Sequence, residues 1–141
     1  MRVIAVDPGK TTGLAWLDNG EPVTREVHEW RQVRHVVAEL EPEMIHVEEF
    51  RVNASTASKT AAPWSLKCYG ALEVYAWENA LLFSHAPSTV KSTVTDARLR
   101  VAGLWKNKSS HERDALRHLV LALAKMNDPW AVSVLLKKEE K

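Results

Sequence analysis

Apolar residues are spaced differently along different parts of this chain, and residues 3–30 have the spacing of strands. The apolar run 3–6 is typical of a strand covered on both faces, and residues 14–17 form a second run after the turn 9–13. Asp18-Asn19-Gly20 is typical of a tight turn, and apolar and polar residues then alternate from 23 to 30. The pattern predicts three consecutive antiparallel strands.

A helix and a fourth strand are predicted next. Apolar residues recur at positions i, i+3, i+4 and i+7, namely Val33, Val36, Val37 and Leu40. This spacing predicts an amphipathic helix over 32–40, and residues 44–47 predict a strand that runs directly into Glu48. A strand that follows a strand and a helix usually lies parallel in the same sheet. We therefore expect the end of this strand beside the end of the first, with Glu48 facing Asp7.

The middle of the chain predicts a loop, a long helix and a fifth strand. Residues 51–60 lack apolar periodicity and are expected to form a loop. A long helix is predicted from Pro63, and Gly70 within it indicates close approach to another element. The apolar stripe of this helix contains Trp64, Cys68, Ala71, Leu72 and Tyr75. Residues 80–84 are the candidate fifth strand.

The last third of the chain predicts helices. Ser88 is expected to cap a short helix that residues 97–101 extend or repeat, and Ser109 with Glu112 forms a capping box for a helix through about Met126. Asp128-Pro129 starts a final short helix. The expected fold is α/β, one domain over residues 1–141, with a five-stranded mixed sheet flanked by helices. Three antiparallel strands come first in it and parallel strands follow.

Composition and charge narrow the class of protein. Of the 141 residues, 45% are hydrophobic and 26% are charged, which is typical of a globular protein. No apolar run reaches the length of a membrane span, and the amino terminus does not resemble a signal peptide, so we expect a cytoplasmic, non-secreted protein. The single cysteine, Cys68, excludes an internal disulfide and a cysteine-based zinc site. Residues 21–49 hold eight acids against three Lys or Arg, whereas residues 87–118 hold seven Lys or Arg against three acids. This asymmetry permits an acidic metal site beside a phosphate-binding rim.

Four residues stand where a metal site is expected. Asp7 and Glu48 end strands, and His111 and Asp114 lie three apart at the start of a helix, hence on one face. Each alone has a structural explanation: a turn residue, a solvated acid, a surface histidine or a partner of the helix dipole. Together, three carboxylates and one imidazole suit Mg²⁺ or Mn²⁺. Two such ions about 4 Å apart promote phosphodiester hydrolysis.

These motifs resemble those of the RuvC-type Holliday junction resolvases, which have the ribonuclease H-like fold. The segments AVDPGKTTGLAW, HVEEF and HERDALRHLVLAL resemble the family's first acidic strand, second acidic strand and closing acidic helix, in the same order. The likeness extends loosely over nearly the whole chain, whose short length suggests a phage-type member. It implies that Asp7 is shared by two divalent ions and that Glu48 and Asp114 bind one ion each. His111 replaces an acid of many members, which permits a preference for Mn²⁺ over Mg²⁺.

The resemblance also suggests DNA contacts and a dimer. Lys91 matches a lysine near the scissile phosphate, and Phe50 matches an aromatic residue that stacks on unpaired bases, although a core position fits Phe50 equally well. Further contacts with DNA are expected from Arg51 and Lys59 in the loop. Lys106 and Lys108 both remain candidates for a second lysine of the family. A homodimer is implied, formed through the helix between Trp64 and Trp77.

The sequence therefore predicts a metal-dependent endonuclease that cleaves four-way DNA junctions by two-metal hydrolysis. Other branched DNA is a further expected substrate. A related nuclease acting on flaps, RNA or replication intermediates is the main alternative. The segment after the first strand also resembles the phosphate loop of actin-like and sugar-kinase ATPases, but those need two such domains and a second phosphate loop. A DNA-binding module without activity would have no need of three intact acids, and Asp7, Glu48 and Asp114 are all present.

Overall fold

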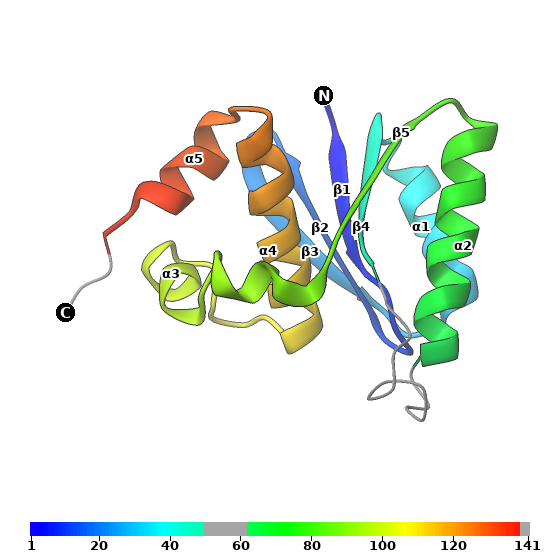
Figure 1. The fold of residues 1–141 in the computed structure, drawn as a ribbon, viewed down its shortest axis with the longest axis horizontal. Coiled ribbons are helices and arrows are strands. Elements are labelled where there is room, and N and C mark those ends of the chain that lie inside the picture. Colours follow the sequence, from blue (N-terminus) through cyan, green and yellow to red (C-terminus); the bar gives the residue numbers. More distant parts are fainter. Residues whose placement is uncertain (50–61, 139–141) are drawn as a thin grey trace.

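A computed structural model describes residues 1–49 and 62–138, and its centre is a five-stranded mixed sheet (Figure 1). The strands are β1 (Val3–Asp7), β2 (Thr12–Asp18), β3 (Glu21–Val27), β4 (Met44–Glu48) and β5 (Leu82–Ala86). Their order is β3-β2-β1-β4-β5. β2 pairs antiparallel with β1 and β3, and β4 pairs parallel with β1 and β5. The predicted sheet is confirmed.

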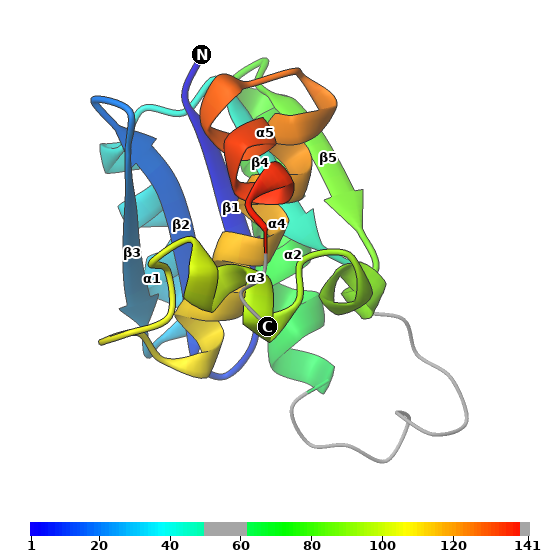
Figure 2. The ribbon, with the colours of Figure 1, turned by 90° about the vertical axis from the view of Figure 1, so that its left-hand side faces the viewer.

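Helices cover both faces of the sheet. They are α1 (Trp30–Glu39), α2 (Ala62–Glu78), η1 (Ser88–Ser92, a 3₁₀ helix), α3 (Asp96–Val101), α4 (Ser110–Lys125) and α5 (Pro129–Leu136). α1 and α2 cover one face, and α4 covers the other (Figure 1). α3 and α5 lie outside α4 (Figure 2), so α4 is enclosed between them and the sheet. This enclosure explains why polar as well as apolar residues of α4 are buried.

The alternation of side chains along β1 and β4 determines which residues face α4. Val3 and Ala5 pack in the core around α4, whereas Ile4 and Val6 pack in the core under α1 and α2. Because successive strand residues point to opposite faces, Asp7 follows Val3 and Ala5 onto the α4 face. The same rule places His46 and Glu48 of β4 on that face, since Ile45 and Val47 belong to the opposite core. Both strands therefore end with an acid directed toward α4.

Two strand boundaries differ from the prediction. The third strand is Glu21–Val27 rather than 23–30, because Asn19 and Gly20 both have positive φ and make a tight turn that starts β3 at once. Glu29 then accepts a hydrogen bond from the Arg31 amide and caps α1. The fifth strand is Leu82–Ala86 rather than 80–84, because Ala80 has a φ of 55° and helps to end α2.

Two local predictions were wrong. Ser88 does not cap a helix: it is the first residue of η1, Pro87 precedes it without a side-chain cap, and Thr95 caps a separate helix α3. No other described element approaches Gly70 closely, because an added Cβ atom there would meet nothing within 4 Å. The capping box of Ser109 and Glu112 at the start of α4 is confirmed.

No single helix among the described residues is long and apolar enough to cross a membrane. By length and composition, α4 and α5 together would suffice, but they meet at an angle of 112°.

Candidate active site

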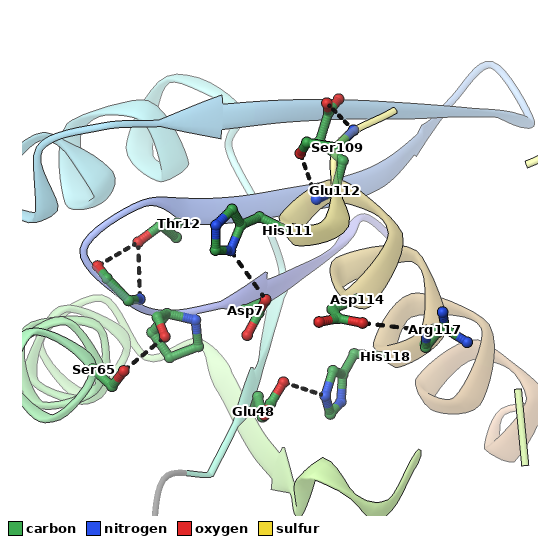
Figure 3. Close-up of polar contacts among 12 residues, drawn as sticks. Asp7, Thr12, Glu48, Ser65, Ser109, His111, Glu112, Asp114, Arg117 and His118 are labelled. Carbon is green, nitrogen blue, oxygen red and sulfur yellow. Dashed lines mark hydrogen bonds and ion pairs between the residues drawn. The ribbon is translucent and has the colours of Figure 1, made fainter. Parts of the chain in front are cut away.

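The four predicted ligands converge where β1 and β4 end beside the start of α4 (Figure 3). The two strands are parallel neighbours, with Val6 opposite Val47, so the acids that follow them lie side by side. His111 and Asp114 extend from the first turns of α4 toward the same place. The sequence placed these side chains correctly, although their role as ligands remains a prediction.

Asp7 lies at the centre of this group. Its Oδ2 atom is 3.8 Å from Nδ1 of His111. Burial raises the pKa of Asp7 to about 7; the contact with His111 opposes this shift, and the charges of Glu48 and Asp114 reinforce it. Contact with Asp7 in turn raises the pKa of His111. The ionised form of Asp7 is therefore disfavoured mainly by its burial, and next by the neighbouring acids.

Glu48 has a closer imidazole partner than Asp7 has. Its Oε2 atom lies 3.0 Å from Nε2 of His118, a fully buried residue one turn beyond Asp114 on α4. Burial alone would raise the pKa of Glu48, but hydrogen bonds with His118 and Asp7 and the charge of Lys91 outweigh it and lower the pKa. Adjacent carboxylates thus have pKa values displaced in opposite directions.

Asp114 is held by two cations. The ammonium nitrogen of Lys91, on η1, is 3.4 Å from Oδ2, and Nε of Arg117 is 3.2 Å from Oδ1. Arg117 is buried and also donates to the carbonyl of Val94 and to Asp96. Lys91 is mostly exposed, so its ammonium remains accessible to a ligand. The structure thereby brings the predicted Lys91 into the site.

The donor set fits divalent cations in its chemistry. Three carboxylates and one imidazole form an oxygen-rich set of ligands without a thiolate, which is the chemistry that Mg²⁺ and Mn²⁺ prefer. In residues 1–49 and 62–138, no three His, Cys, Asp or Glu side chains lie close enough together to hold one ion. The three carboxylates instead contact basic side chains: His111, His118, Lys91 and Arg117.

The turn after Asp7 is fastened to α2. Ser65 donates a hydrogen bond of 2.9 Å to the carbonyl of Pro8, and the Thr12 hydroxyl lies 3.4 Å from the amide and carbonyl of Gly9. Cys68, buried beneath this turn, has its pKa raised to about 11 by burial. A thiol with such a pKa is a poor nucleophile, in agreement with the structural role expected for it.

The predicted DNA-binding residues have different positions. Lys106 is exposed beside Arg100, Gly103 and Trp105, where it lines a cavity outside the cluster of acids. Lys108 is half-buried, and its ammonium donates a 3.1 Å hydrogen bond to Thr24 of β3. These contacts leave Lys106 as the freer cation. Phe50, Arg51 and Lys59 lie outside the described residues.

The sequence reasoning missed two residues of the site, Arg117 and His118. Both interrupt the apolar run of α4, and they follow Asp114 by three and four positions, which places them on its side of the helix. It also missed His46, which precedes Glu48 by two positions and shares its face. Strand alternation and helical spacing together contained the signal for all three.

Comparison with known proteins identifies the fold. No protein-family model and no curated protein sequence matches this chain. Solved structures do match. Among them, Thermus thermophilus RuvC in complex with a Holliday junction substrate has a TM-score of 0.65 and 22% identity, covering 89% of this chain and 96% of that one. A second structure of Thermus thermophilus RuvC has a TM-score of 0.59 and 22% identity, covering 90% and 97%. The chain therefore has the RuvC-type, ribonuclease H-like fold.

Proposed function

We propose that this protein is a divalent-metal-dependent endonuclease that hydrolyses phosphodiester bonds in four-way DNA junctions. The observation that carries the proposal is the convergence of Asp7, Glu48, His111 and Asp114 at one edge of a RuvC-type sheet. The similar Thermus thermophilus protein has been seen with a Holliday junction substrate, and this likeness favours a branched DNA over a linear one.

Each residue has a role in this proposal. Asp7, Glu48, His111 and Asp114 hold two divalent ions, which, when bound, supply Lewis acidity for hydrolysis. Lys91 contributes an exposed positive charge 3.4 Å from Asp114, where it stabilises negative charge that develops on the phosphoryl group. The buried Arg117 holds Asp114 in place through its 3.2 Å contact with Oδ1. Lys106 adds an exposed cation for the DNA backbone.

We also propose that two copies associate through the outer face of α2. Leu66, Val74 and Trp77 are large apolar residues exposed on this helix, whereas Cys68 and Leu72 on its other side are buried. A hollow of about 450 Å³ lies beside Trp77 and Val74. Two sites on a two-fold dimer match the two-fold symmetry of a four-way junction.

The test is cleavage of synthetic DNA with Mg²⁺, with Mn²⁺ and with neither. Substrates are a four-way junction, a flap, an RNA–DNA hybrid and a linear duplex of the same sequences. We expect wild type to cut the junction only with a divalent ion, and Asp7→Asn to lose this activity. Undiminished cleavage by Asp7→Asn would exclude the proposed site. If the protein cuts the flap or the hybrid faster than the junction, it is a nuclease for that substrate class instead. Equal cutting of the linear duplex and the junction would exclude junction selectivity.

A further inference from the structure

A pair of buried imidazoles lies behind Glu48. His46 of β4 and His118 of α4 are 2% and 0% exposed, and their ring centres are 5.5 Å apart. His118 contacts Glu48 through Nε2 at 3.0 Å, while His46 contacts Ser84 of β5 through Nδ1 at 2.6 Å. The other ring nitrogen of each has no hydrogen-bond partner among the described residues. The two histidines are thus equally buried, but only one touches the cluster of acids.

Packing alone does not explain His118. Ala115 and Ala122, one turn to either side of it on α4, are buried apolar residues, so an apolar side chain at this position would continue the same surface. An imidazole instead leaves Nδ1 buried without a partner, which costs free energy. Its one hydrogen bond therefore accounts for its presence, and that bond is to Glu48.

The geometry defines what this bond does. Because Nδ1 has no acceptor nearby, the proton belongs on Nε2, which donates to Oε2 of Glu48. This contact comes from a helix that is itself enclosed on both sides, so it restricts rotation of the carboxyl group. The same helix carries Asp114 one turn earlier, which fixes the two acids relative to each other.

We propose that His118 is a positioning residue that orients the Glu48 carboxylate to bind a divalent cation. The inference rests on the proposed function, since it assumes that Glu48 is a cation ligand. Hydrogen bonds behind a ligating carboxylate typically contribute 10- to 100-fold to metal affinity or activity. Removal of His118 should therefore weaken binding of Mn²⁺ even when DNA is absent.

The experiment compares three variants by Mn²⁺ titration calorimetry of the protein without DNA. His118→Leu should weaken binding about 10-fold or more. His118→Gln, whose side-chain amide can donate in place of Nε2, should stay within about 3-fold of wild type. His46→Leu removes the equally buried neighbour and should leave the affinity unchanged. If His118→Leu does not fold, His118→Asn replaces it, because the shorter amide does not extend as far as Nε2.

The outcomes separate this inference from the proposed function. Wild-type affinity in His118→Leu, or an equal loss in His46→Leu, would overturn the positioning role. A wild-type protein that neither binds Mn²⁺ nor cleaves DNA would contradict the proposed function itself. A readout independent of metal is the ¹⁵N spectrum of His118 at neutral pH, in which we expect a protonated Nε2. A bare Nε2 would also overturn the inference.

Discussion

Gly13 of β2 lies directly against the backbone of His111 at the start of α4. A Cβ atom at Gly13 would be well under 3.0 Å from the carbonyl group of His111, a separation that real Cβ atoms essentially never have. Gly13 is paired with Asp7 in the sheet, so one glycine adjoins the strand and the helix that carry the site. The sequence placed this residue at the end of the turn 9–13; the structure shows that its lack of a side chain sets the distance between the hairpin and α4.

Replacing Gly13 with alanine should displace the first turn of α4, because the obstructing atoms belong to backbone. We expect a loss of about 1–3 kcal/mol in the free energy of unfolding, as for other overpacked cores, and a large loss of nuclease activity. Urea denaturation and junction cleavage measure the two effects. Gly70→Ala is the control: the added methyl group meets nothing within 4 Å and should stabilise α2 by up to about 1 kcal/mol. Equal stability of both variants would contradict this prediction, because it would mean that α4 can shift away from the added Cβ atom at no cost.

The raised pKa of Asp7 predicts that the metal-free protein loses stability as pH rises. Between the ordinary aspartate pKa of 3.8 and the raised pKa of about 7, the folded protein binds a proton that the unfolded chain has released, so the free energy of unfolding falls across this pH range. Contact with Asp7 also raises the pKa of His111, so deprotonation of His111 lowers the free energy of unfolding further as pH rises. Asp7→Asn does not ionise and should be more stable than wild type at pH 8, by an amount on the order of 2–4 kcal/mol.

Thermal unfolding at pH 5 and pH 8, with a chelator present, measures this difference. Asp96→Asn is a control of opposite sign, because Arg117 lowers the pKa of that exposed carboxyl and the substitution should not stabilise the protein. Equal unfolding temperatures of wild type and Asp7→Asn at pH 8 would contradict the account.

Arg117 should be among the residues most sensitive to substitution. Its buried guanidinium donates to Asp114, Asp96 and the carbonyl of Val94, which joins α4 to α3 and to the residues between η1 and α3. Arg117→Met leaves the buried Val94 carbonyl without this donor and removes one of the two cations that contact Asp114, and should cost about 3 kcal/mol of stability. Arg117→Lys should not restore it, since one ammonium does not reproduce the planar fork. Urea denaturation tests both, with exposed Arg34→Met expected within about 0.5 kcal/mol of wild type.

The sequence predicted most of the sheet and the four acidic and imidazole positions of the site because both depend on local patterns. Asp7 and Glu48 follow apolar runs, and a capping box marks the helix of His111 and Asp114. Arg117 and His118 were missed because their partners are distant in the sequence and meet α4 only in the folded protein: Val94 and Asp96 contact Arg117, and Glu48 contacts His118. The close contact at Gly13 likewise depends on where α4 crosses β2, which no local pattern encodes.

Lys91 should matter for catalysis and little for stability. Its side chain is 61% exposed, and an ion pair so accessible to water contributes at most about 1 kcal/mol. Lys91→Met should therefore unfold almost as wild type does, while turnover of a junction falls about 100-fold or more. Lys125→Met, an exposed substitution in the last turn of the same helix as Asp114, should leave turnover unchanged. Unaltered turnover in Lys91→Met would remove this residue from the mechanism.

Trp77 tests the proposed dimer. Its side chain is 83% exposed on the outer face of α2, near the exposed Val74, and a large aromatic residue in this position gains free energy when a partner covers it. Trp77→Glu places a charge there and should shift the protein from dimer to monomer in sedimentation experiments. The variant should still show a cooperative thermal unfolding transition. Leu136→Glu, an exposed apolar position at the end of α5, should leave the dimer intact. A wild-type monomer at all concentrations, or dissociation by both variants, would contradict association through α2. Monomeric Trp77→Glu should still make single nicks in a junction but lose paired cuts, because each site is built within one chain whereas two are needed to cut both strands.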